Sequence, residues 1–174
     1  MIKRLSLFRA AVFFNYTMDL IIQQRLELLR HGFFERILPL DASITPLWGK
    51  MNLQQMLEHL SDSVRIANGK DPQSEILTPA ERLSAVQDFL KSEKEFRPGT
   101  KNALLGEEPL PVRNPTIDAA VKELKQDVEE FIQRFESEPG LIVRNPFFGD
   151  LDFNGWTALF HKHFLHHLRQ FNAG

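Results

Sequence analysis

Histidine is the residue type in this sequence with the most chemical potential, and four of the six histidines lie in one stretch, FHKHFLHHLRQF at residues 160–171. In an α-helix, which advances about 100° per residue, His163 and His167 point to the same apolar side, whereas His161 points away and His166 lies at the flank. Two neutral imidazoles four residues apart on one helix are a recurring pair of metal ligands. The spacing therefore suggests metal binding, provided that a third ligand comes from elsewhere in the chain.

His59 is the histidine outside this stretch that lies beside an apolar helical stripe, in WGKMNLQQMLEHL at residues 48–60. An imidazole in an apolar core costs about 1–3 kcal/mol when its polar atoms have no partner. A divalent ion shared by His59, His163 and His167 would give all three rings a partner. Hydrogen-bonded core histidines without a metal explain the same pattern, and the spacing alone leaves both interpretations open.

Four long segments repeat apolar residues at the three- and four-residue steps of an amphipathic helix. They lie at about residues 18–38, 52–68, 115–137 and from 152 towards the C-terminus, and a shorter helix is expected between residues 78 and 97. Asn52 followed by Gln55 is typical of an N-cap with its capping box, and Asp152 is a second N-cap. No pair of strands is predicted. Amphipathic helices must bury their apolar stripes against one another, so the sequence predicts an all-α fold, a four-helix bundle with an additional short helix and long loops.

The size and composition of the chain limit the classes of protein to which it can belong. The 174 residues fit one domain, and 43% apolar with 25% charged residues is ordinary for a globular protein. A net charge of −2 argues against nucleic acid as a partner. The sequence contains no cysteine, which excludes thiolate metal ligands. No apolar run approaches the ~18 residues that a membrane-spanning helix needs. The basic and apolar start is interrupted by Arg9, unlike a signal peptide. We interpret residues 1–17 as a dispensable N-terminal extension and residues 18–174 as a single helical domain in the cytoplasm.

Two segments together carry a resemblance to a known group of proteins: WGKMNLQQMLEHL and FGDLDFNGWTALFHKHFLHHLRQF. They resemble the DinB/YfiT-like superfamily of metal-binding four-helix bundles, and within it an uncharacterised branch with a domain of unknown function. The resemblance covers about residues 20–172 and implies that His59, His163 and His167 bind a divalent metal ion, usually zinc, nickel or iron. Many members continue after the last histidine with Arg-Gly-Gln, where this chain has Leu168-Arg169-Gln170.

Three protein nitrogens leave coordination positions open, which is the pattern of a catalytic metal site. Relatives include thiol-dependent S-transferases, so the resemblance implies a metal-dependent transferase or a hydrolase that acts on a small molecule, with a low-molecular-weight thiol as a partner. Dimers are common among relatives, which makes a homodimer an expectation here. A non-enzymatic metal-binding or stress-associated protein, and a helical dimerisation module without metal, are the alternatives.

Three further polar residues are candidates to orient a ligand or a bound water: Gln55, Gln170 and His166. Glu58 and Asp62 could act as general bases, but both lie on the side of their helix that faces away from its apolar stripe, so the pattern predicts that they are exposed. Trp48 and Trp156 are interpreted as packing anchors.

Overall fold

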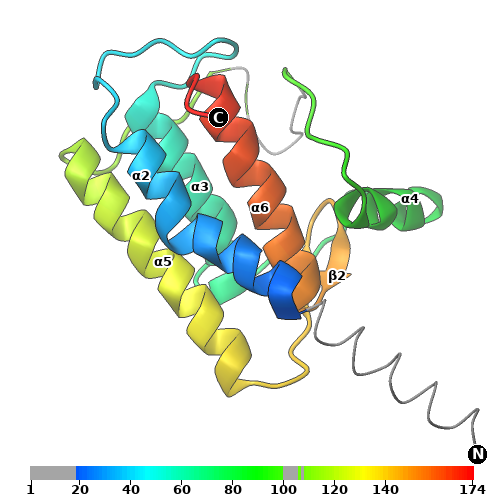
Figure 1. Ribbon diagram of the computed structural model, residues 1–174. Coiled ribbons are helices and arrows are strands. Elements are labelled where there is room, and N and C mark those ends of the chain that lie inside the picture. Colours follow the sequence, from blue (N-terminus) through cyan, green and yellow to red (C-terminus); the bar gives the residue numbers. More distant parts are fainter. Residues whose placement is uncertain (1–18, 100–105, 107) are drawn as a thin grey trace, which may run out of the picture.

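The computed structural model describes residues 19–99, 106 and 108–174, and within these ranges the chain is mostly helical with one two-stranded sheet (Figure 1). The expectation of a mostly helical protein is confirmed. The N-terminal extension expected at residues 1–17 lies outside the described residues. Among the described residues, no helix combines the length and the apolar character that a membrane crossing requires.

The first helix runs through residues 19–37 and contains a π-helical segment, η1 (Leu28–Gly32), followed by α2 (Phe33–Ile37). The helix is present as predicted, but the π-helical segment is not part of the prediction. Two pairs of adjacent residues are buried around it, Leu28 with Leu29 and Phe33 with Phe34. A π-turn holds more residues than an α-turn and so shifts the buried face along the helix. This shift lets both residues of each pair face the core.

Helices α3 (Leu53–Asn68) and α5 (Ile117–Ser137) lie side by side and make the most extensive contact between elements of the described fold. The predicted capping box is confirmed, since Asn52 accepts a hydrogen bond from the Gln55 N–H and the Gln55 side chain accepts one from the Asn52 N–H. The α3–α5 contact also holds a buried polar bond, in which Ser61 Oγ donates to the Asp127 carboxylate over 2.5 Å. The carboxylate therefore ties the middle of α3 to α5.

Helix α6 (Phe153–Gln170) begins at Asp152, the predicted N-cap, whose side chain accepts from the Gly155 N–H. Its buried aromatic side chains, among them Trp156 and Phe160, pack into the core with those of the other long helices. The shorter helix, α4 (Ala80–Lys91), lies to one side of the long helices and contacts α6 (Figure 1).

Two short strands precede α6 and correct the expectation that no strand pair is present. Strands β1 (Val143–Asn145) and β2 (Gly149–Leu151) pair antiparallel around a turn in which Asn145 Oδ1 accepts from the N–H groups of Phe147 and Phe148. Each strand has three residues, which is too short for an alternating apolar pattern to show in the sequence. The Trp156 indole donates to the Val143 carbonyl, so the hairpin is fastened to the start of α6.

Glu58 is buried, with 4% of its surface exposed, and this overturns the expectation that it faces solvent. Its carboxylate accepts hydrogen bonds from the backbone N–H groups of Arg113 and Asn114, each over 2.9 Å. The loop before α5 therefore folds over α3 and is held there by the carboxylate, a tertiary contact that helix periodicity cannot show. Asp62 was expected to be exposed but is partly buried, and its carboxylate forms an ion pair with Arg113.

The ionisation of Glu58 makes part of the stability of the fold dependent on pH. Burial alone would raise the pKa of Glu58, but the hydrogen bonds from Arg113, Asn114 and Gln54 lower it below its ordinary value of 4.5. A carboxylate with a lowered pKa stabilises the fold above its unfolded-state pKa and loses that contribution as the pH falls through its folded-state pKa. We expect Glu58→Gln to lower the free energy of unfolding by about 1–3 kcal/mol at pH 7. The difference from wild type should shrink below pH 4.5.

Urea unfolding at a series of pH values measures this difference directly. Glu81→Gln, at an exposed position in the first turn of α4, is the control and should change little. A Glu58→Gln variant as stable as wild type at pH 7 would contradict the role of this carboxylate.

Candidate metal site

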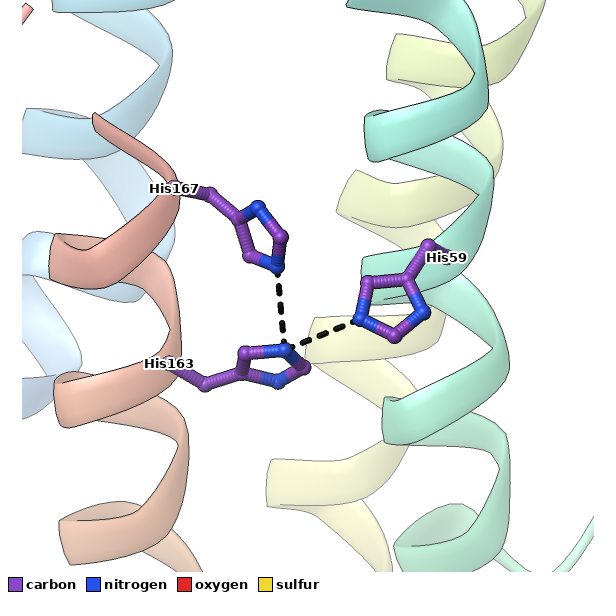
Figure 2. Close-up of side chains that lie close together, drawn as sticks. All are labelled: His59, His163 and His167. Atoms are coloured by element: carbon purple, nitrogen blue, oxygen red, sulfur yellow. Dashed lines mark hydrogen bonds between the residues drawn. The ribbon is translucent and has the colours of Figure 1, made fainter. Parts of the chain in front are cut away.

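Three histidine rings from two helices meet between α3 and α6 (Figure 2). His59 comes from α3, and His163 and His167 lie one turn apart on the facing side of α6. The Nε2 atom of His163 lies 3.0 Å from Nε2 of His59 and 3.1 Å from Nε2 of His167. Each ring offers one nitrogen, and these three nitrogens all lie within 4.8 Å of one another. The structure thus brings together the three residues that the sequence selected.

The two short contacts compete for a single nitrogen atom, Nε2 of His163 (Figure 2). A neutral imidazole nitrogen carries either one hydrogen or one lone pair, so it can donate to one neighbour or accept from one neighbour. At most one of the two contacts is therefore a full hydrogen bond, and the other either shares the same hydrogen or lone pair or places like groups face to face. A cation between the rings removes this conflict, because each nitrogen then directs a lone pair at the cation.

Two of the three spacings between the nitrogens are close to the spacing that a divalent ion requires, and all three lie within 4.8 Å. Two ligand nitrogens bound to a tetrahedral ion at ~2.0–2.1 Å lie ~3.3 Å apart. The 3.0 and 3.1 Å contacts of His163 differ from that spacing by a few tenths of an ångström, which small rotations of the rings would supply. The three histidines could therefore hold a metal ion.

The environment keeps all three rings neutral, which is the form that binds metal. Burial lowers the pKa of His59 to about 4, with a further contribution from His166. Burial also holds the pKa values of His163 and His167 well below 6.5, and the neighbouring imidazoles lower them further. His167 is buried, whereas His59 and His163 are partly exposed. Part of the surface of His59 and of His163 is therefore in contact with solvent.

Of the three residues predicted to support the ligands, Gln170 lies against one of them. The amide oxygen of Gln170 is 2.7 Å from Nδ1 of His167. Gln55 is engaged elsewhere, since it caps α3 and donates to the Leu110 carbonyl. His166 is outside the group of three nitrogens: its ring packs edge to face against His167, with centroids 5.2 Å apart, and its Nδ1 lies 3.4 Å from the Phe96 carbonyl.

Phe96 is a neighbour of the site that the sequence did not indicate. Its ring centroid is 6.2 Å from that of His163 and 6.2 Å from that of His166, with the rings edge to face. The segment that carries Phe96 follows α4 and is fastened to α6, because Lys162 Nζ donates to the Lys94 carbonyl over 2.7 Å. Phe96 lies in a loop without apolar periodicity, so no sequence signal places it beside the histidines.

One family matches the chain, described as "Protein of unknown function (DUF1569)", and the match covers residues 31–173. The chain belongs to the DUF1569 family. The prediction of an uncharacterised domain family is thereby confirmed. The matched region of this DUF1569 protein includes all three histidines of the site and Gln170. No curated protein and no solved structure matches the chain.

The lowered pKa of His59 predicts that the metal-free DUF1569 protein loses stability in mild acid. Between pH 6.5 and about 4 the unfolded chain binds a proton at His59 that the folded chain excludes. The free energy of unfolding should then fall with decreasing pH by up to about 1.4 kcal/mol per pH unit for each such ring. Urea unfolding of the metal-free protein between pH 7 and pH 5 measures this slope. A His59→Leu variant should show a shallower slope, and equal slopes for the two proteins would refute the account of the buried neutral rings.

Proposed function

We propose that this DUF1569 protein is a cytoplasmic metalloprotein that binds one divalent ion through His59, His163 and His167. The observation that carries the proposal is the double contact at Nε2 of His163, 3.0 Å from one imidazole nitrogen and 3.1 Å from another. Neutral rings can form only one full hydrogen bond at this nitrogen and must share it or leave the second contact unsatisfied, whereas one cation would satisfy both contacts at once. Zinc, nickel and iron all accept imidazole ligands, so the donor set does not choose among them.

We further propose that the fold is a DinB-like four-helix bundle. The helix at residues 19–37, α3, α5 and α6 supply the four long helices, and their buried side chains form one hydrophobic cluster. The resemblance of residues 48–60 and 148–171 to that superfamily supports the same arrangement. In such bundles, metal sites are built from side chains on facing helices, as α3 and α6 face each other here.

We favour an enzyme over a passive metal carrier because three histidines leave coordination positions free and two of them are partly exposed residues. A divalent ion held there supplies Lewis-acid chemistry at its remaining positions. The protein contributes the rest: a small molecule would approach past the partly exposed His59 and His163, Phe96 lies edge to face beside the His163 ring, and the Gln170 amide oxygen faces Nδ1 of His167. A metal-dependent transferase or hydrolase that acts on a small molecule fits these features.

Metal content tests the proposed site. Protein purified without a histidine tag should contain about one divalent ion per chain, because three imidazoles form a complete protein ligand set for such a site. His163→Ala should abolish binding, since it removes the ring that both other rings contact. Elemental analysis after dialysis gives the ratio of metal to protein. His31→Ala, at an exposed position of η1, is the matched control and should keep the ion. Wild-type protein that stays free of metal after incubation with zinc, nickel and iron would end the proposal.

Thermal shift separates a thiol-dependent enzyme from a passive metal binder. A low-molecular-weight thiol that ligates the ion at an open position should raise the melting temperature of the metal-loaded protein, because a ligand that binds only the folded state stabilises it. The same compound with a hydroxyl group in place of the thiol is the control and should raise it less. A panel of thiols that leaves the melting temperature of the loaded protein unchanged would argue against thiol chemistry and in favour of the passive binder.

A further inference from the structure

The segment LWGKM at residues 47–51 leads into α3, and its first two residues bond to Gln170, the last residue of α6. The Leu47 N–H donates to the backbone carbonyl of Gln170 over 2.7 Å. The side-chain amide of Gln170 donates to the Trp48 carbonyl over 2.8 Å. Gln170 is buried, and its amide oxygen is the group that faces Nδ1 of His167. One glutamine side chain thus connects the backbone of this segment to a metal ligand.

These contacts determine which nitrogen of His167 carries its proton. A backbone carbonyl can only accept, so the NH₂ group of Gln170 must face Trp48 and the amide oxygen must face His167. An amide oxygen also only accepts, so Nδ1 of His167 must donate to it over the 2.7 Å contact. In a neutral ring the other nitrogen, Nε2, then carries the lone pair. Figure 2 shows that this nitrogen points toward His163, while Nδ1 points away from it.

Gly49 allows the amide of Gln170 to reach this position. A Cβ atom built at Gly49 would lie 3.0 Å from Nε2 of Gln170, closer than ordinary van der Waals contact. Gly49 also has a φ of +79°, a backbone conformation that residues other than glycine rarely adopt. Any other residue at position 49 would therefore push against the amide that holds His167.

We propose that the Trp48–Gly49 turn is a positioning element of the metal site, which acts through Gln170 to hold His167 with its proton on Nδ1 and its lone pair on Nε2. The consequence for metal affinity rests on the proposed function, but the position of the proton does not. Without an acceptor at Nδ1 the proton can occupy Nε2 instead, and a protonated Nε2 cannot bind a metal ion. Outer partners of this kind commonly change metal affinity by about 10–100-fold when they are removed.

Nitrogen NMR of the histidine rings tests the position of the proton in the metal-free protein at neutral pH. In wild type, His167 should show its proton on Nδ1. In Gln170→Leu, which removes the acceptor, and in Gly49→Ala, which displaces it, the Nε2-protonated form should become populated. Zinc affinity, measured by competition with a chromophoric chelator, should fall at least 10-fold in both variants.

Gly140→Ala is the matched control for Gly49→Ala. Gly140 has a φ of +85° and no atom within 4 Å of an added Cβ, so the variant carries the same backbone strain without touching Gln170. It should keep the proton on Nδ1 and the zinc affinity of wild type. If Gly49→Ala does not fold, Gln170→Leu alone decides the question. A His167 ring that keeps its proton on Nδ1 in Gln170→Leu, with unchanged zinc affinity, would overturn the inference. A wild-type protein that binds no metal would overturn the proposed function, while the proton position would still be decided by the NMR comparison.

Discussion

The structure depends on one unusual constraint, the meeting of three neutral imidazole nitrogens at a point between two helices. Nε2 of His163 faces two other nitrogens at hydrogen-bond distance, although it can form a full hydrogen bond with only one of them. Protonation of the rings does not remove the conflict, because burial disfavours the charged form of each ring. A cation coordinated by all three rings would resolve it, and the contacts around α3 and α6 hold these rings in place.

Different segments support α3 and α6. Helix α3 carries His59 and is fixed to α5 by the buried Asp127 carboxylate, which accepts from Ser61. The buried Glu58 carboxylate fixes α3 to the loop that precedes α5. The end of α6 is fixed by the segment before α3, which bonds both the backbone and the side chain of Gln170. Asp127 also accepts from Lys70 over 2.7 Å, so its charge is paired at the edge of the core. Buried charged groups of this kind stabilise a fold only when their partners are in place, and here each one joins two separate elements.

Local signals in the sequence predicted the parts of this structure that local interactions determine. The caps at Asn52 and Asp152 depend on residues within one turn, and both are present where the sequence predicts them. The shared direction of His163 and His167 follows from the helical repeat alone. The placement of His59 opposite them needed the resemblance to a known superfamily as well, because its position at the edge of an apolar stripe does not specify which helix it faces.

The parts that the sequence did not predict depend on contacts between distant segments. The burial of Glu58 results from the loop near Arg113 folding over α3, and an amphipathic pattern in α3 alone favours the opposite placement. The π-helical segment Leu28–Gly32 shifts the buried face of the first helix, and the burial of Leu28 and Leu29 in the core stabilises this shift. Trp48 was predicted as a packing anchor, yet the contact that matters for the site is made by its backbone carbonyl, whose chemistry is the same in every residue.

The central claim is that the three rings share a single ion, and anomalous diffraction tests it most directly. Crystals of the zinc-loaded protein, measured on either side of the zinc absorption edge, should give one strong anomalous peak between α3 and α6. The account predicts that this peak lies ~2.0–2.1 Å from Nε2 of His59, His163 and His167. A peak bound to other residues, or a peak bound by only one of the three rings with His59 turned away, would contradict it.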